Sequence, residues 1–160
     1  MARADVNDVD MGWKRIESQL RAFEKASVLV GFQEGSVTKT QVKGQREKEG
    51  GLSMPEIASA NEFGTKTIPA RPFMRTSFDE NYRKITSLIN TQYDQISEGK
   101  SSAEKSLNAI GVIMVGLIQQ KIRAIVSPPN SPRTIAIKGS SKPLIDFGQM
   151  IQSVTYKVQK

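Results

Sequence analysis

Residues 61–73 read NEFGTKTIPARPF, and this stretch decides how the rest of the chain is arranged. Gly64 follows an apolar run at helical spacing, which predicts the end of a short helix with a left-handed C-cap. Pro69 and Pro72 each favour an extended conformation at the residue before them. Pro72 also has the φ angle that suits the first turn of a new helix. The stretch therefore predicts a rigid elbow between two helices.

Arg71 lies between the two prolines and carries a planar fork of five hydrogen-bond donors. Two interpretations of this residue are open. In the first, Arg71 forms a structural ion pair with a local carboxylate such as Glu62. In the second, the elbow presents a surface that faces a partner.

The composition limits the classes of protein to which the chain can belong. Its 160 residues, enough for one domain, include no cysteine and no histidine. Disulfide frameworks, thiolate metal sites and the commonest general base are therefore absent. No apolar stretch approaches the roughly 20 residues that span a bilayer. MARADVNDVD has no apolar signal region. We expect a soluble intracellular protein without membrane contact.

Apolar residues at helical spacing predict four helices, over residues 11–24, 53–63, 73–97 and 102–126. Ser53 and Glu56 match a capping box at the start of the second helix. The connection between the two long helices is short, so we expect them to pack antiparallel as an αα-hairpin. The expected buried faces consist of Trp13, Ile16, Leu20 and Phe23; Ile57, Ala60 and Phe63; and Met74, Phe78, Tyr82, Ile85, Ile89, Tyr93 and Ile96.

The stretch 107–118, LNAIGVIMVGLI, is apolar nearly all round. A helix of this kind has to be covered on several sides. It is too short to span a membrane, which favours a central core helix over a membrane-active segment. A neighbouring subunit could supply part of its cover.

Alternating apolar residues predict a strand over 27–33, near the middle of a sheet, and a terminal strand over 153–158. Pairing these strands gives an α+β fold, in which a small, mostly antiparallel sheet packs on long helices that cover one face. Residues 127–143 predict a proline-rich extended surface segment with a single turn at 134–138. Residues 144–152 predict a short helix or turn.

Residues 34–52 contain four basic side chains among Gly, Gln, Ser and Thr, which predicts a flexible loop or a long hairpin. With a formal net charge of +7 for the whole chain, this segment is the best candidate for non-specific DNA contact. No aromatic residue lies within it for base stacking. The candidate contacts are Lys39, Lys43, Arg46 and Lys48.

Motifs that carry chemistry are missing from the sequence. We find no phosphate-binding loop, no dinucleotide-binding turn and no nucleophile elbow. The closest carboxylate pairs are Asp8 with Asp10 and Asp79 with Glu80, and these more often solvate a helix than perform catalysis. We therefore expect no enzyme activity, no catalytic residue, no metal site and no cofactor.

Two blocks of the sequence carry a resemblance to a known family. Residues 61–81, NEFGTKTIPARPFMRTSFDEN, and residues 128–158, PPNSPRTIAIKGSSKPLIDFGQMIQSVTYKV, occur in the order found in the tail-component family of tailed phages. Members of that family include tail-completion, neck and minor tail proteins. The chain has Phe147 where the family commonly has Thr, which puts a side-chain cap at that point in doubt.

The resemblance implies a virion structural protein of the neck. It would be made in the host cytoplasm and would assemble as a homo-oligomer, a hexameric ring at the head–tail junction. Its role would be tail completion or tail termination, with head–tail joining or DNA binding in the neck lumen as the alternatives. Its partners would be the tail tube, the head–tail connector and packaged DNA. The structural or interface residues implied are Glu62, Phe63, Gly64, Pro69, Ala70, Arg71, Pro72, Phe73, Leu144, Asp146 and Gly148.

Overall fold

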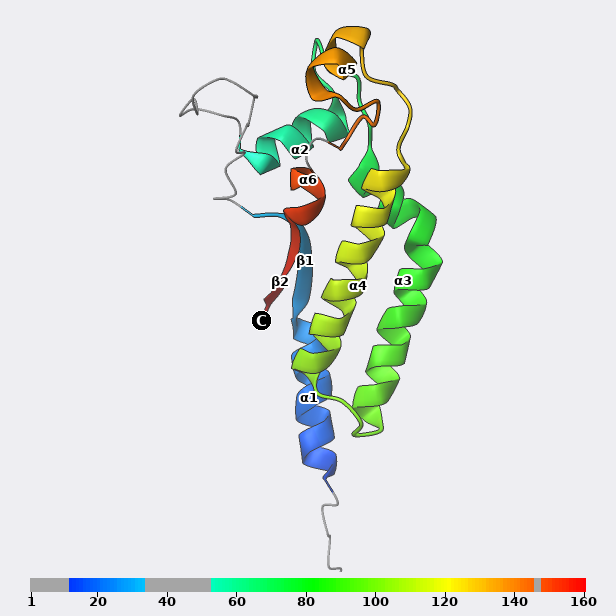
Figure 1. Ribbon diagram of the computed structural model, residues 1–160. Coiled ribbons are helices and arrows are strands. Elements are labelled where there is room, and N and C mark those ends of the chain that lie inside the picture. The colour runs from blue at the N-terminus through cyan, green and yellow to red at the C-terminus, as the bar shows by residue number, and fades with distance from the viewer. Residues whose placement is uncertain (1–11, 34–52, 146–147) are drawn as a thin grey trace, which may run out of the picture.

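A computed structural model describes residues 12–33, 53–145 and 148–160. The predicted basic loop, with Lys39, Lys43, Arg46 and Lys48, lies outside the described residues, and so does Asp146. Within the described parts, helices and strands follow one another as α1 (Trp13–Lys25), β1 (Ser27–Phe32), α2 (Met54–Phe63), α3 (Phe73–Ser97), α4 (Ala103–Ala124), α5 (Pro132–Lys138), α6 (Gln149–Gln152) and β2 (Val154–Gln159). The molecule is elongated, with α1 at one end and α5 at the other (Figure 1).

The two strands form an antiparallel sheet in which Val28 pairs with Val158 and Phe32 with Val154. One face of this sheet packs on the helices through Val28, Val30 and Phe32. The predicted α+β fold, with a small antiparallel sheet packed against long helices, is therefore confirmed.

The predicted position of the first strand near the middle of a sheet stays a prediction, because residues 34–52 lie outside the described residues. The described sheet has two strands, so β1 has one neighbour within it. The second face of β1 is partly covered by the described residues: Leu29 is 50% exposed, whereas a Cβ atom at Gly31 would lie 3.7 Å from the Met74 side chain. Apolar residues on both faces of the strand indicated burial on both sides, whereas the core clusters of the described residues contact it through Val28, Val30 and Phe32.

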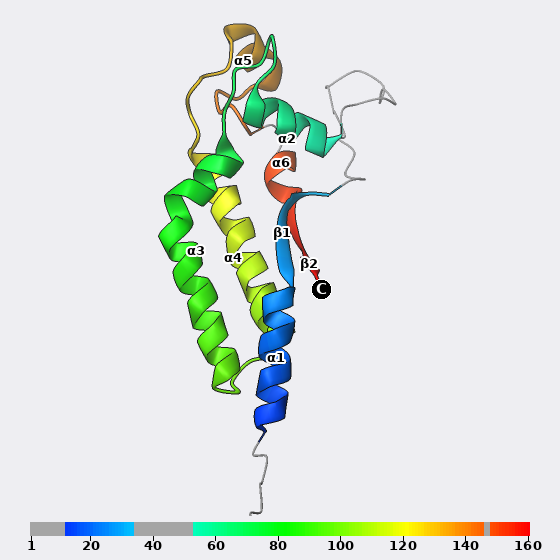
Figure 2. The ribbon, with the colours of Figure 1, turned by 180° about the vertical axis from the view of Figure 1, so that it is seen from behind.

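The two long helices α3 and α4 lie side by side, and the chain runs along them in opposite directions (Figures 1 and 2). Residues 98–102 connect them, and the side chain of Ser102 accepts from the backbone N–H of Lys105 at the start of α4. Helix α4 also contacts α1, β1 and β2, so it is the central element of the fold. Helix α4 packs against α1 and both strands as well as against α3, so α3 and α4 are not a separate pair. The more specific prediction of an αα-hairpin stays a prediction.

The core consists of two apolar clusters, one toward each end of the molecule. The first contains Met54, Ala58, Phe73, Ile118, Ile122, Leu144, Met150 and Val154. The second contains Phe23, Ile96, Ala103, Leu107, Ile110 and Met114. Helix α4 contributes to both clusters, and this explains why its sequence is apolar on several sides. None of the described helices has the length and hydropathy of a membrane span.

Six predicted core residues are exposed instead, namely Trp13, Phe63, Phe78, Tyr82, Ile89 and Tyr93. Phe63, Tyr82 and Trp13 are 71%, 71% and 64% exposed. In α2 the buried side chains are Met54, Ala58 and Glu62, which lie on another side of the helix from Phe63. Periodicity locates apolar residues on a helix, but it does not say which of them another element of the same chain covers.

The segment predicted to be extended, residues 127–143, contains the seven-residue helix α5. The side chain of Ser131 accepts from the backbone N–H of Thr134, and Pro132 occupies the first turn. This is a helix start of the ordinary kind. The four prolines of the segment indicated extended chain, yet the third of them, Pro132, is the residue with which the helix begins.

Candidate functional site

The elbow begins at Gly64, which has φ 79° and ψ 168°. The positive φ agrees with the predicted cap, but ψ places the residue outside the left-handed helical region, in a region that is essentially open to glycine alone. A Cβ atom at this position would lie 2.9 Å from the Ala70 nitrogen and 3.1 Å from the Ile68 oxygen. Gly64 is therefore required for its backbone conformation and for the close return of the chain.

Backbone hydrogen bonds fold the elbow back onto α2. The Thr65 N–H donates to the Ile68 carbonyl at 2.8 Å, and the Arg71 N–H donates to the Asn61 carbonyl at 2.7 Å. The Thr65 hydroxyl accepts from the backbone N–H groups of Thr67 and Ile68. The chain between the two helices is thus held at several points, and the predicted rigidity has a physical basis.

Glu62 joins α2 to the start of α3. Its carboxylate is 5% exposed and accepts from the backbone N–H groups of Met74 at 2.9 Å and Arg75 at 3.0 Å. Helix α3 has Pro72 at its N-cap and no cap from that side chain, so Glu62 satisfies donors that would otherwise be unpaired. A negative charge at this end also suits the helix dipole.

The predicted ion pair between Arg71 and Glu62 is wrong, because Arg71 binds a different part of the chain. Its Nε donates to the Pro128 carbonyl at 2.7 Å. Its Nη2 donates to the Pro129 carbonyl at 3.1 Å and to Asn130 Oδ1 at 3.4 Å. Its Nη1 donates to Asn61 Oδ1 at 3.5 Å. The guanidinium thus ties the elbow to residues 128–130.

All of these acceptors are neutral. Arg71 is 4% exposed, and no carboxylate of the described residues bonds to its guanidinium. Burial lowers the pKa of Arg71, although an arginine stays charged at neutral pH. The site therefore holds a buried positive charge with neutral hydrogen-bond partners.

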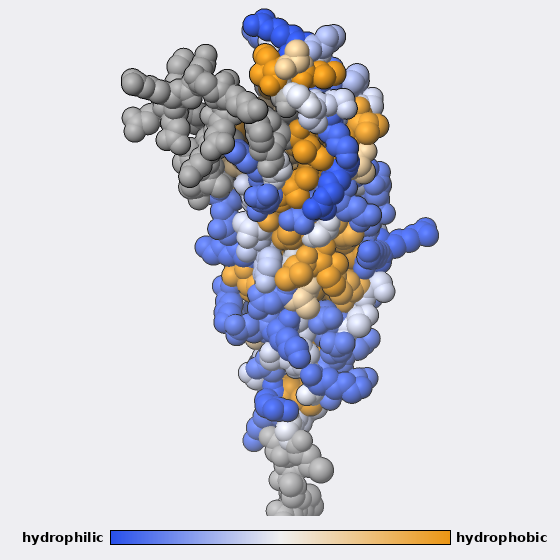
Figure 3. Space-filling view, viewed as in Figure 1, coloured by the Kyte–Doolittle hydropathy of each residue, from blue (hydrophilic) through white to orange (hydrophobic). Residues whose placement is uncertain are grey.

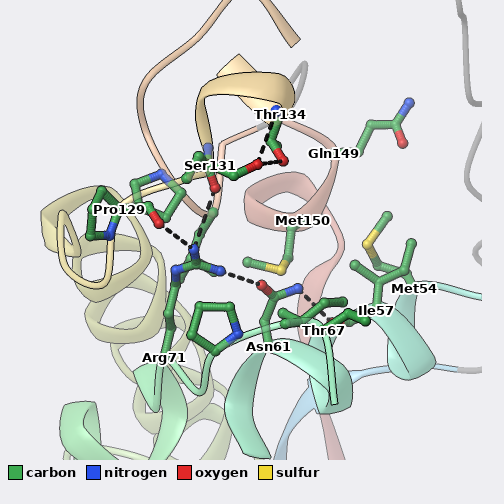
Figure 4. A pocket seen from close by; sticks show the side chains of 15 residues that line it. Met54, Ile57, Asn61, Thr67, Arg71, Pro129, Ser131, Thr134, Gln149 and Met150 are labelled. Carbon is green, nitrogen blue, oxygen red and sulfur yellow. Dashed lines mark hydrogen bonds between the residues drawn. The ribbon is translucent and has the colours of Figure 1, made fainter. Parts of the chain in front are cut away.

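A pocket of about 650 Å³ opens beside this arginine. Figure 4 shows Arg71 between Pro129 and Asn61 at the pocket wall. Apolar walls come from Met54, Ile57, Ile68, Leu144 and Met150, and polar groups from Asn61, Asn130, Ser131, Thr134 and Gln149. Among the described side chains that line the pocket, Arg71 alone is charged. We call this hollow the elbow pocket.

The structure brings together most of the residues predicted from the two sequence blocks. Pro69 and Arg71 line the elbow pocket with Leu144, which is also buried in the core. Ala70 and Pro72 belong to the elbow, and Phe73 is fully buried, with its ring edge-on to Phe32 at 6.0 Å. Gly148 precedes α6 with φ 72°. Phe63 is the exception, since it points to solvent from α2.

The sequence did not indicate the acceptors of Arg71. Two of them are backbone carbonyl groups, at Pro128 and Pro129, and any residue has such a group. The third and fourth are the side chains of Asn61 and Asn130, which lie inside the two blocks but carry no distinctive spacing. The proximity of the two blocks could have been suspected, but the bonding pattern could not.

A second feature is a row of exposed apolar residues along α3. The row begins at Phe78 and continues with Tyr82, Ile89 and Tyr93, which follow Phe78 by 4, 11 and 15 positions. These spacings place all four residues on one side of a helix. They are between 37% and 71% exposed. We call this row the α3 stripe. On α4, Val112 and Ile113 are exposed as well, and apolar surface is visible over this helix in Figure 3.

The described residues contain no group of three or more His, Cys, Asp or Glu side chains that could hold a metal ion. The elbow pocket has one buried cation and several amides and hydroxyls, which suits recognition of an anionic group. No family model, curated protein or solved structure matches the chain.

Proposed function

We propose that this chain is a virion structural protein of a tailed phage, which assembles as a ring in the neck at the head–tail junction. Its role is that of a tail-completion or tail-terminator subunit. The proposal starts from the resemblance of residues 61–81 and 128–158 to the tail-component family. Arg71 from the first block hydrogen-bonds to residues 128–130 of the second, so the two blocks form one unit.

The observation that carries the proposal is the α3 stripe. Its four side chains lie on one side of a 25-residue helix and are not covered by other described elements. Contiguous exposed apolar surface of this kind often marks a protein–protein interface. Tyrosine and phenylalanine are also enriched in such interfaces. A long helix with an uncovered stripe suits a subunit whose neighbours cover it.

Assembly would then proceed by burial of surface. Neighbouring copies in a ring contact each other through two different patches, and the rotation between copies has to close. Removal of the α3 stripe from water would supply part of the driving force. The tail tube and the head–tail connector would contact the two faces of the ring, and the protein would be found in the neck of the virion.

The stripe can be tested without altering the core. Tyr82→Glu places a charge on the stripe, and we expect loss of incorporation into phage particles with little change in thermal stability. Ser87→Glu is the matched control, since Ser87 is exposed on the same helix about 140° around the axis from Tyr82. Incorporation is measured by quantifying the chain in purified particles. Equal incorporation of both variants would contradict a role for the stripe, and absence of the wild-type chain from particles would contradict the proposed function.

Head–tail joining and DNA binding are the alternatives. A joining protein is also a ring subunit, so only the identity of its neighbours distinguishes it. For DNA binding, the favourable observation is the net charge of +7. The segment 34–52 contributes little to this charge, because Glu34, Glu47 and Glu49 accompany its four basic residues. Replacement of Lys39, Lys43, Arg46 and Lys48 by Gln should remove salt-dependent duplex binding if the alternative holds.

A further inference from the structure

Arg71 in the elbow pocket forms no ion pair with a carboxylate of the described residues, although Glu62 is buried in the same elbow. Arg71 is 4% exposed, and its four hydrogen bonds go to carbonyl and amide oxygens. The bond from Nη1 is the longest, at 3.5 Å, and lies at the limit of a hydrogen bond. A guanidinium binds a carboxylate more strongly than it binds neutral oxygens. The pocket therefore has the chemistry of a site for an acidic group.

We propose that the elbow pocket of one copy binds residues 1–11 of a neighbouring copy, with an aspartate carboxylate on Arg71. This inference rests on the proposed ring and names one of its contacts. The elbow would then bind a neighbouring copy, in addition to linking α2 and α3.

Residues 1–11 have a composition that complements the pocket. They contain three acidic residues, Asp5, Asp8 and Asp10, and one basic residue, Arg3. Val6 and Val9 lie among the aspartates. The pocket offers one buried cation beside the apolar side chains of Met54, Ile57, Ile68, Leu144 and Met150. A segment with both acidic and apolar residues can place a carboxylate on the cation and apolar side chains against the apolar walls.

The same segment cannot reach the pocket of its own copy. Helix α1 with 13 residues and strand β1 with 6 follow each other toward α2 (Figures 1 and 2). Together they cover about 40 Å. The pocket lies at the far end, between α2, α6 and the segment that carries α5. Asp5 is seven residues from Gly12, a span of at most about 25 Å. If residues 1–11 occupy the pocket, they therefore come from another copy.

An arm that leaves one end of a subunit and binds at the other end of the next subunit makes a head-to-tail contact. Contacts of this type join two different surfaces and produce a closed ring when the rotation between copies allows it. A contact of this kind agrees with the proposed ring. Its support is the charge of Arg71 and the length of residues 1–11, and it does not depend on the α3 stripe.

The test is a titration of a fluorescent peptide of residues 1–11 into the full-length chain carrying Asp5→Asn, Asp8→Asn and Asp10→Asn. These substitutions remove the competing carboxylates of the chain itself. We expect the wild-type peptide to bind, and the peptide with the same three Asn substitutions to bind about tenfold more weakly. Arg71→Lys in the protein should weaken binding of the wild-type peptide by a similar factor, because lysine lacks the planar fork.

Two further variants separate binding from folding. Ile57→Trp fills the pocket without changing Arg71 and should also weaken binding, which keeps the test valid if Arg71→Lys unfolds the protein. Lys142→Ala removes an exposed charge of the same segment that does not line the pocket, and should leave the affinity unchanged.

Equal binding of the wild-type and Asn-substituted peptides, or no binding of either, would overturn the inference. So would binding of a duplex oligonucleotide that Arg71→Lys and Ile57→Trp abolish while the peptide does not compete, because the pocket would then recognise phosphate. Incorporation into particles is measured separately. A chain that enters particles but does not bind the peptide would refute the contact between residues 1–11 and the elbow pocket. The proposed function would still stand.

Discussion

Each end of the molecule contains an apolar core cluster, but among the described residues the elbow end alone adds buried charged side chains. At the elbow, two buried charged side chains, Glu62 and Arg71, hydrogen-bond to backbone groups. In the half formed by α1, α3, α4 and the sheet, the core cluster consists of Phe23, Ile96, Ala103, Leu107, Ile110 and Met114. The elbow end thus combines packed apolar side chains with directional hydrogen bonds from buried charges, whereas the core cluster of the helical half contains apolar side chains only. Loss of one hydrogen-bond acceptor at the elbow should therefore lower the free energy of unfolding. In the helical half, added side-chain atoms should lower it.

The largest effect is expected at Glu62. Glu62→Ala removes a charged acceptor and leaves the N–H groups of Met74 and Arg75 without a partner in a buried site. We expect the free energy of unfolding to fall by about 3 kcal/mol, as measured by denaturant titration. Glu62→Gln keeps one amide oxygen and should lose roughly half as much. Ordinary surface substitutions change the free energy of unfolding by about ±0.5 kcal/mol. If Glu62→Ala costs no more than this, the carboxylate does not stabilise the start of α3.

The helical half is probed by Gly111→Ala. A Cβ atom at Gly111 would overlap the ring of Tyr156 on β2, whose hydroxyl donates to Asn108 Oδ1 at 3.0 Å. We expect a loss of about 2 kcal/mol from overpacking, in spite of the better helix propensity of alanine. Thermal and denaturant unfolding measure it. A stabilised Gly111→Ala protein would show that Tyr156 moves aside without cost.

Gly116→Ala is the counterpart on the same helix. Gly116 is exposed, and no atom lies within 4 Å of the Cβ that would be added. Alanine should therefore raise the free energy of unfolding by up to about 1 kcal/mol. The measurement is made in dilute solution, where contacts between copies do not contribute. Destabilisation would reveal a packing constraint that the described residues do not explain.

The smallest effect is expected at the capping box of α2. Hydrogen bonds from the backbone N–H and the hydroxyl of Ser53 lower the pKa of Glu56 in the folded protein. Because the folded-state pKa is the lower one, the stabilisation is present above the unfolded-state pKa and is lost as the pH falls through the folded-state value. The stability difference between wild type and Glu56→Gln should thus shrink between neutral pH and about pH 3. A difference that is independent of pH would contradict the charged cap.

Much of the fold could be predicted from the sequence because its signals are local. The capping box at Ser53, the glycine at position 64 and the prolines of the elbow each act on their own neighbours. The helix ranges, the pairing of the two strands and the α+β class followed from these signals and from periodicity.

The errors concern which element covers which. The described elements leave Tyr82 and Phe63 71% exposed and Leu29 50% exposed, although all three have the spacing of core residues. Arg71 was paired with Glu62 because opposite charges lie nearby in sequence, whereas backbone groups proved to be the partners of both. These errors are informative about function, since an apolar side chain without a partner in its own chain marks a surface that another copy can cover.

The most direct measurement is a side-chain-resolution image of the neck of purified particles that contain the chain. We predict a ring of copies in which the α3 stripe is buried between neighbours and Arg71 contacts an aspartate of the adjacent copy. A particle without this chain, or a ring in which Phe78, Tyr82, Ile89 and Tyr93 all face solvent, would contradict the proposed role.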